Sequence, residues 1–185
     1  MDIKIVENYV PINEQELRDK EQMLEAYNKI GDALFERHPV AHFTASSMIL
    51  NKEHTKVLFQ FHKIYQAWCW SGGHNDGDEN FFSVAYREAK EECGLEELDV
   101  VSEYPMSLDT LWVQGHIKRG EYVSGHLHFN LAYLFECEES STIRVKEDEI
   151  DGLKWIDLKD LKSVSEEEIY PIYCKMLERL GIKHD

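Results

Sequence analysis

Long apolar runs and basic charge are both scarce in this chain. No stretch approaches the roughly 20 consecutive apolar residues that are needed to span a bilayer, so we expect no membrane partner. The formal net charge is -16, and an acidic surface repels nucleic-acid backbones and anionic membrane surfaces. We therefore expect no nucleic-acid polymer as a partner. A small anionic substrate would need bound divalent cations to offset the repulsion.

Cysteine is also scarce, and its spacing excludes the common cysteine motifs. The four cysteines are Cys69, Cys93, Cys137 and Cys174. They form no CxxC pair and no zinc-binding pattern with histidine. The first ten residues, MDIKIVENYV, lack the basic region and long apolar stretch of a signal peptide. These absences favour a cytoplasmic protein with reduced thiols.

The 185 residues, with a hydrophobic fraction of 43%, are enough for one domain with a sizeable core. A short strand is predicted over 3–10, and the apolar spacing after Asn13 predicts an amphipathic helix that Pro39 ends. The following pattern predicts, in order, strands at 42–51 and 56–63, a helix at 80–93, strands at 98–113, 126–137 and 153–156, and a helix at 166–180 capped by Ser165. This order indicates a mixed α/β domain.

Three glutamates share one face of the helix predicted over 80–93. Glu88 lies three residues before Glu91 and four before Glu92, so the three carboxylates crowd together. Carboxylate oxygens suit Mg²⁺ or Mn²⁺. The Gly72–Gly73 pair lets the backbone approach a ligand closely, and a glycine carbonyl could complete the metal shell. Taken alone, such a run of acidic residues is more often a solvated helix surface.

A longer pattern around these glutamates resembles the Nudix box. That box reads Gly, five residues, Glu, seven residues, Arg-Glu, an aliphatic residue, one residue, Glu-Glu, one residue, Gly and an aliphatic residue. All seven fixed identities are present: Gly73, Glu79, Arg87, Glu88, Glu91, Glu92 and Gly94. At roughly 7% background usage each, seven such identities would coincide about once in 10⁸ starting positions. The order of elements extends the resemblance over about 42–160.

The resemblance implies a fold and an activity. The fold is a Nudix-type α/β/α sandwich with a mixed β-sheet over 41–185, with a helical extension over 1–40 packed on it and an added C-terminal helix. The activity is metal-dependent hydrolysis of a diphosphate linkage in a small nucleoside-diphosphate-X molecule, by water attack on phosphorus with Mg²⁺ or Mn²⁺. A homodimer is left open.

The resemblance also assigns roles to particular residues. Glu88 and Glu92 match the main metal ligands, and Glu91 matches a third ligand that helps to activate water in some members. Gly73 matches the position whose carbonyl can bind metal. Glu79 and Arg87 match a structural salt bridge next to the catalytic glutamates. The general base varies in this family, and Glu147 and Glu149 in an acidic loop are candidates besides the box glutamates.

Four further residues are candidates for substrate binding. His126 and His128 alternate on one strand, so both could face a cleft and contact phosphate. His74 lies inside the box, near the expected phosphate site. Trp112 lies 17 residues after the box, where an aromatic residue resembles dinucleoside polyphosphate hydrolases. The alternative for each is ordinary packing, because strand histidines and tryptophans are often half-buried.

Two other functions remain open from the sequence. One is a non-catalytic, nucleotide-binding regulatory module of the Nudix type, although such relatives usually lose box glutamates. The other is an enzyme similar to isopentenyl-diphosphate isomerase, which needs a reactive cysteine. Cys69 lies beside the glycine loop, but its neighbours Trp68 and Trp70 do not match the motif of that isomerase.

Overall fold

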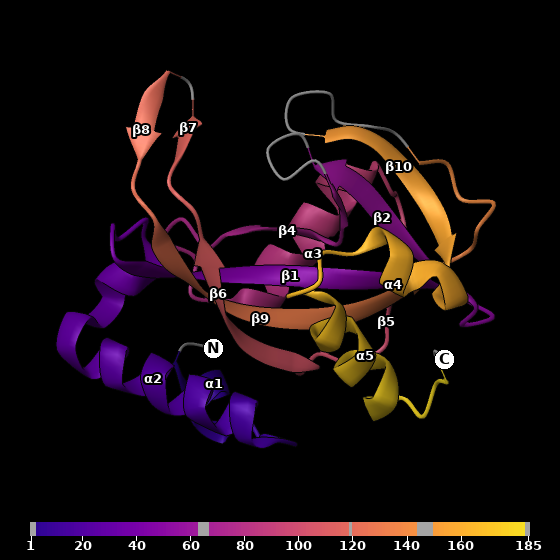
Figure 1. Cartoon of the computed structure of the whole chain (residues 1–185). Helices are drawn as coiled ribbons and strands as arrows, with labels where there is room; N and C mark the ends of the chain where they lie inside the picture. Colours follow the sequence, from indigo (N-terminus) through magenta and orange to yellow (C-terminus); the bar gives the residue numbers. More distant parts are fainter. Residues whose placement is uncertain (1–2, 63–66, 119, 144–149, 184–185) are drawn as a thin grey trace.

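The computed structural model describes residues 3–62, 67–118, 120–143 and 150–183. A mixed sheet forms the centre of the molecule (Figure 1), and within the described residues it has eight strands. Its strands are β1 (Ala41–Asn51), β2 (Lys56–His62), β3 (Ala67–Cys69), β4 (Ser71–His74), β5 (Asp99–Val100), β6 (Ser107–Val113), β9 (His126–Cys137) and β10 (Ile150–Asp157). None of the helices described is both long and apolar enough to cross a membrane.

The two longest strands, β1 and β9, run parallel at the centre of the sheet. Their register pairs His42 with His128 and Asn51 with Cys137. On the side away from β9, β1 pairs with two different strands along its length. Its first half pairs with β4, and its far end pairs with β2 through Ile49 and Leu50. The strands β2 and β4 therefore diverge from one another beside the first half of β1.

The two faces of this sheet bury two separate apolar clusters, because side chains alternate along each strand. On one face, Phe43 and Phe129 join the apolar side of α3 (Phe81–Cys93). On the other, Met48 and Leu134 pack with the C-terminal helices η2 (Leu158–Asp160), α4 (Leu161–Val164) and α5 (Tyr170–Arg179). The mixed α/β sandwich that the sequence predicts is therefore confirmed.

The helix α3 begins and ends where the sequence predicts. The side chain of Asn80 accepts a hydrogen bond from the Ser83 amide at 3.2 Å, which caps the first turn. Gly94 adopts a left-handed conformation with φ 62° and ends the helix, as glycine at this position commonly does. Between these ends, Val84, Ala85 and Ala89 are fully buried against the sheet. Packing of this apolar side on the sheet therefore fixes the orientation of the opposite side of α3, which carries the glutamates.

The N-terminal segment differs from the predicted strand. Residues Lys4–Asn8 form a short helix, α1, and the long helix α2 follows at Glu14–Ile30, capped by Asn13 as predicted. Val6 and Tyr9 are buried in the same apolar cluster as α3. They are three residues apart, which is the spacing of one helix face, whereas residues on one face of a strand are two apart. Figure 1 shows α1 and α2 along one side of the sheet, where α2 packs on β6.

Three other boundaries also differ from the sequence prediction. The helix α2 ends at Ile30 because Gly31 takes φ 73°, and a 3-10 helix, η1, continues over Gly31–Phe35. The predicted strand over 98–113 is split into β5 and β6 around Pro105. Ser165 does not cap the last helix, because its hydroxyl donates to the Leu161 carbonyl at 2.7 Å. That helix, α5, instead begins at Tyr170, with Pro171 in its first turn.

A short hairpin lies between β6 and β9. Its strands are β7 (His116–Lys118) and β8 (Glu121–Val123), which pair antiparallel. The hairpin projects away from the body of the molecule beside β6 and β9 (Figure 1). Ile117 and Tyr122 on it are largely exposed.

Candidate active site

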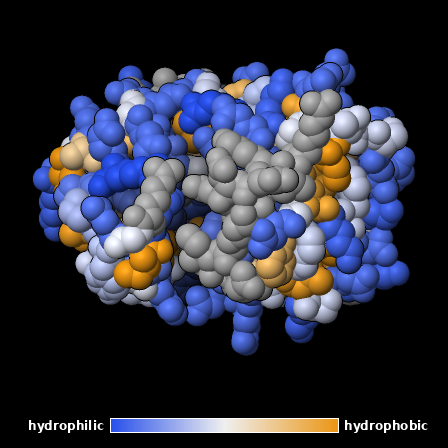
Figure 2. All heavy atoms as spheres, turned by 90° about the horizontal axis from the view of Figure 1, so that it is seen from above, coloured by the Kyte–Doolittle hydropathy of each residue, from blue (hydrophilic) through white to orange (hydrophobic). Residues whose placement is uncertain are grey.

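A large cavity opens where β2 and β4 diverge. Its volume is about 860 Å³, which lies within the usual range for small-molecule sites. It is lined by residues from β1, β2, β4, α3, β6, β9 and the segment before α5. Seen from above, this side of the molecule is hollowed and mostly hydrophilic (Figure 2). The residues that the sequence singled out on α3 and β9 both reach this cavity.

Close contact between Gly73 and Glu88 joins β4 to α3 at the cavity wall. A Cβ atom at Gly73 would lie only 2.6 Å from Cδ of Glu88 and 2.9 Å from its Oε2. Any side chain at position 73 would therefore displace the carboxylate. The backbone of β4 at Gly73 thus lies against the carboxylate of Glu88, and a carboxylate in this position suits the divalent metal that the resemblance implies.

Glu92 is held firmly in the same wall. It is only 8% exposed, and its Oε2 accepts hydrogen bonds from the Gly72 amide at 3.1 Å and from Nε2 of Gln60 at 3.0 Å. Gln60 was not among the residues chosen from the sequence, because a single glutamine in a strand gives no motif. Glu91 also lines the cavity but is more exposed.

The expected salt bridge between Glu79 and Arg87 is replaced by other contacts. Arg87 lies 3.6 Å from Oδ2 of Asp78 and 3.3 Å from Oε1 of Glu88. Glu79 is exposed beside Asn80, which is occupied in capping α3. Arg87 thus links the loop before α3 to Glu88. Its partner in that loop is Asp78, in place of the expected Glu79.

Four histidines gather on the face of the sheet opposite α3. His74, His126 and His128 were expected near the substrate, whereas His42 on β1 was not singled out. The centroids of the rings of His42 and each of the other three lie 4.8 to 4.9 Å apart. Nε2 of His126 lies 3.2 Å from Nε2 of His128. The pairing of β1 with β9 and with β4 brings His42 to this group, and no local sequence pattern marks such long-range pairing.

Burial lowers the pKa of three of these imidazoles, those of His42, His74 and His128, and so favours their neutral form. It lowers the pKa of His74 to about 3, with the positive charge of Arg37 adding to the effect. It lowers the pKa of His128 to about 2, assisted by the neighbouring histidines. The pKa of His42 is lowered as well, mainly by burial. Neutral imidazoles do not attract phosphate by charge, so ionic binding of phosphate through these rings is disfavoured.

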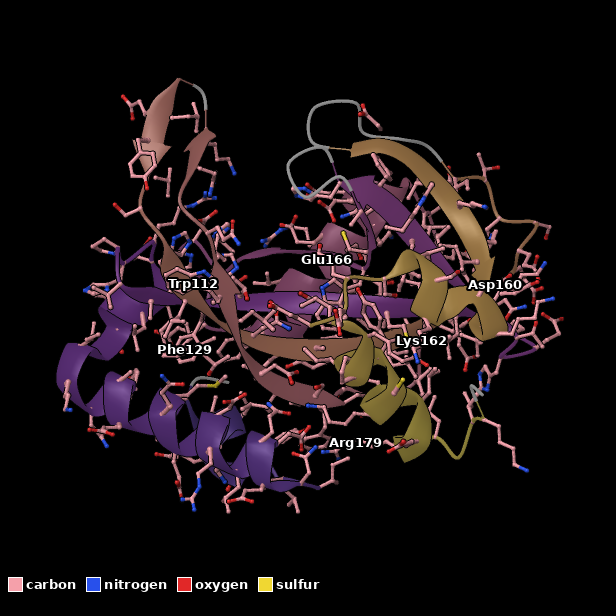
Figure 3. The ribbon with its side chains drawn as sticks, viewed as in Figure 1. Trp112, Phe129, Asp160, Lys162, Glu166 and Arg179 are labelled. Atoms are coloured by element: carbon pink, nitrogen blue, oxygen red, sulfur yellow. The ribbon has the colours of Figure 1, made fainter. Side chains whose placement is uncertain are left out.

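The tryptophans of the region have different environments. Trp112, on β6, is 61% exposed and lines the cavity, so its ring can accept a stacking partner. Trp70 is buried against Tyr173, with ring centroids 5.1 Å apart in a T-shaped arrangement. Figure 3 shows Trp112 and Glu166 well apart along the sheet.

Some cavity residues escaped the sequence reasoning. Arg37 and Lys118 bring positive charge to the wall, and Glu166 enters it from the segment before α5. Burial, followed by repulsion from Glu168, raises the pKa of Glu166 above its usual 4.5. No local motif marks these residues, because they come from segments far apart in the chain. The candidates Glu147 and Glu149 lie outside the described residues.

The comparisons with known proteins agree with this geometry. The family model described as NUDIX domain matches residues 41–180. A hydrolase of the NUDIX family from Clostridium perfringens is 25% identical, with a TM-score of 0.55, and covers 75% of this chain and 97% of its own. An Ap4A hydrolase from C. elegans is 20% identical, with a TM-score of 0.57 and the same coverage. No curated protein sequence matches the chain.

A third structure is the NUDIX domain of Shewanella oneidensis NrtR, crystallised with ADP ribose. It is 14% identical, with a TM-score of 0.53, and covers 84% of this chain and 97% of its own. Because the family model spans more than half of the chain, the chain belongs to the Nudix family, as a hydrolase of acid anhydrides in phosphorus-containing compounds.

Proposed function

We propose that this hydrolase cleaves a diphosphate linkage in a small, nucleotide-derived molecule by water attack on phosphorus. The observation that carries the proposal is the close contact of Gly73 with the carboxylate of Glu88 in the wall of the 860 Å³ cavity. Glu91 and Glu92 line the same wall. Three carboxylates in one place on an already acidic chain favour a bound cation.

The metal-binding residues in this proposal are Glu88, Glu91, Glu92 and the carbonyl of Gly73, and the ion is Mg²⁺ or Mn²⁺. Such an ion, when bound, polarises a phosphoryl oxygen and lowers the pKa of bound water. The chain supplies the positioning. Gln60 and the Gly72 amide fix one oxygen of Glu92. Arg87, bound between Asp78 and Glu88, limits the motion of Glu88.

For the general base we propose a carboxylate at the cavity. Glu91 is the candidate from the box, and Glu166 is an added candidate because its pKa is raised towards neutrality by burial. Glu147 and Glu149 keep the role that the family resemblance gave them. Replacing each by glutamine and comparing pH–rate profiles would separate them, because loss of the base removes the acidic limb of the profile.

The substrate side of the cavity suits a nucleotide. Trp112 presents an exposed ring to it, and Arg37 and Lys118 add positive charge at the wall. An aromatic face can stack on a base, and cations can contact phosphate. The Ap4A hydrolase and the ADP-ribose complex among the similar structures make dinucleoside polyphosphates and ADP-ribose natural first substrates to test.

The isomerase alternative is weakened by the state of Cys69. Burial, followed by the negative charge of Glu92, raises the pKa of this thiol to about 12. A thiol with so high a pKa is protonated at neutral pH and is a poor nucleophile or acid. The regulatory alternative is weakened by the intact set of glutamates.

The test is a panel of nucleotide sugars, dinucleoside polyphosphates and ADP-ribose, assayed with and without Mg²⁺. We expect metal-dependent hydrolysis of at least one class. Glu92→Gln should lower kcat by at least about 10²-fold, the size of a lost strong electrostatic contribution. Glu96→Gln is the matched control, because Glu96 is exposed beyond the end of α3. Turnover by Glu92→Gln close to that of the wild type would refute the ligand assignment.

A further inference from the structure

The four histidines of the cavity form a set of their own. His42 and His128 are direct partners in the register of β1 and β9, and His126 lies two residues before His128 on the same face. His74 pairs with Thr44 on β1, so it shares that face as well. Gly73, one residue earlier, lies on the other face, towards Glu88. The histidines and the glutamates are therefore on opposite sides of β4.

We propose that His42, His74, His126 and His128 bind a zinc-like transition-metal ion, at a site distinct from the glutamates of α3. One ligand nitrogen from each of His42, His74 and His128 can be chosen so that all lie within 4.8 Å of one another. The ring of His126 lies 4.8 Å from that of His42 and 5.0 Å from that of His128. Imidazole nitrogen is a preferred ligand of zinc, copper, nickel and iron, and magnesium prefers oxygen.

The hydrogen bonds of two of the rings show which nitrogen faces the cluster. Nδ1 of His42 lies 3.0 Å from the His38 carbonyl oxygen, and Nδ1 of His126 lies 2.8 Å from the Ser124 carbonyl oxygen. A carbonyl oxygen only accepts, so each Nδ1 must carry the proton. In the neutral form of each ring, Nε2 then carries a lone pair. Backbone carbonyls fix the tautomer of metal-binding histidines in the same way.

His42 supplies a second, independent observation. It is only 4% exposed, yet its Nε2 has no hydrogen-bond partner among the residues described here. A buried acceptor without a partner costs roughly 1–3 kcal/mol, so a bound group that pairs with it stabilises the site. A phosphate oxygen would not satisfy this nitrogen, because both atoms are acceptors. A cation would satisfy it.

The distances agree with a shared ion. Two nitrogens that each lie about 2.0–2.1 Å from a tetrahedral zinc ion are roughly 3.3 Å apart. Nε2 of His126 and Nε2 of His128 are 3.2 Å apart. An N–H···N hydrogen bond would explain this contact too, but it would leave Nε2 of His42 without a partner. The chosen nitrogens of His42, His74 and His128 lie within 4.8 Å of one another, so zinc binding requires them to move closer together.

The test measures metal binding without any substrate. The chain is stripped with a chelator and titrated with Co²⁺, whose visible absorption reports tetrahedral nitrogen coordination, and Zn²⁺ is then added in competition. We expect one equivalent of each ion to bind per chain. His42→Gln and His128→Gln should each weaken Zn²⁺ binding by at least about 10–100-fold, the loss seen even for residues that only support a ligand.

Two matched variants separate this site from the rest of the chain. His54→Gln alters a histidine in the turn between β1 and β2, outside the cavity, and should leave Zn²⁺ binding unchanged. Glu92→Gln should also leave it unchanged, although it abolishes most hydrolysis. Equal loss in Glu92→Gln and His128→Gln, or no tetrahedral Co²⁺ absorption in the wild type, would overturn the proposal.

X-ray absorption of the wild-type chain with one equivalent of Zn²⁺ needs no variant, so it remains decisive if the substituted chains fail to fold. We expect a nitrogen shell with imidazole scattering, and a shell of oxygen alone would refute the site. This proposal and the proposed function fail separately. A chain that binds Zn²⁺ at the histidines but hydrolyses nothing would refute only the hydrolase mechanism.

Discussion

Two polar clusters in this molecule differ in how completely their central acceptor groups are paired, the Glu16 carboxylate in one and the His42 imidazole in the other. The first joins α2, β6 and α5 through Glu16, Asp109, Lys175 and Arg179. Oε1 of Glu16 contacts Tyr9 and Lys175, and Oε2 contacts the Ile12 amide and Arg179, all at 2.7 to 3.0 Å. The second is the histidine cluster, in which Nε2 of His42 has no partner in the described chain.

The difference indicates different roles. A buried ion whose partners are all present contributes to the scaffold, because removing one partner leaves another charge uncompensated. A buried acceptor left unpaired lowers stability, and a ligand that pairs with it would offset this cost. The glutamates of α3 lie between these cases, since Glu92 has partners on one oxygen and also faces the cavity.

The largest effect is expected from breaking the paired cluster. Glu16→Gln leaves Lys175, which is 6% exposed at its side chain, facing Asp109 without its second carboxylate. We expect a loss of about 3–5 kcal/mol in the free energy of unfolding, the cost of breaking a buried ion pair. Chemical denaturation measures it. Glu14→Gln on the exposed side of α2 is the control and should leave the midpoint unchanged, and a similar loss in both would contradict the scaffold role.

A substitution at the glutamate site should lower the catalytic activity more than the stability of the fold. Gly73→Ala places a Cβ 2.6 Å from Cδ of Glu88, so the carboxylate must move. We expect kcat/KM to fall by about 100-fold, since small displacements of catalytic groups have effects of this size. Steady-state kinetics on the best substrate of the panel gives the answer. An alanine variant as active as the wild type would show that the position of Glu88 does not matter.

Trp112→Ala should raise KM by about 10-fold and change kcat little. The exposed ring can stack on a base, and such stacking contributes roughly 1–3 kcal/mol. Trp112→Phe keeps an aromatic face and should restore most of the affinity. A KM that is the same in the alanine variant and the wild type would mean that the base binds elsewhere in the cavity.

Breaking the histidine cluster should affect stability only slightly. In the absence of metal, we expect His128→Leu to change the free energy of unfolding by about 1 kcal/mol or less, because an apolar side chain replaces a half-buried neutral ring. The stabilisation that added Zn²⁺ gives the wild type should disappear in the variant. A loss as large as that of Glu16→Gln would place the histidines in the scaffold.

The smallest effect is a pH dependence of the paired cluster. Burial raises the pKa of Glu16, but the hydrogen bonds from Ile12, Tyr9 and Lys175 lower it more, so that it lies below 4.5 in the folded chain. A lowered pKa means that the stabilisation is complete above pH 4.5 and is lost as pH falls through the folded value. The difference in stability between wild type and Glu16→Gln should therefore shrink only below pH 4.5. A difference that is constant down to pH 3 would show that the carboxylate is not stabilised by its partners.

The sequence alone determined the local features of this protein. The caps at Asn13, Asn80 and Gly94 depend on residues within four positions, so they could be predicted. The side of α3 that carries Glu88, Glu91 and Glu92 follows from helical spacing, and the spacing of the box identified the family. The start of the chain was predicted wrongly because a short apolar segment fits a strand or a helix until its packing partner is known.

Only the tertiary structure decided which distant residues meet. The parallel register of β1 and β9 brings His42 to His128, and the middle of α5 brings Lys175 to Glu16. Gln60 reaches Glu92 because β2 diverges from β4. Each of these contacts joins residues more than 30 positions apart, and no local pattern encodes such pairing. Backbone hydrogen bonding and burial of the two sheet faces fix them instead.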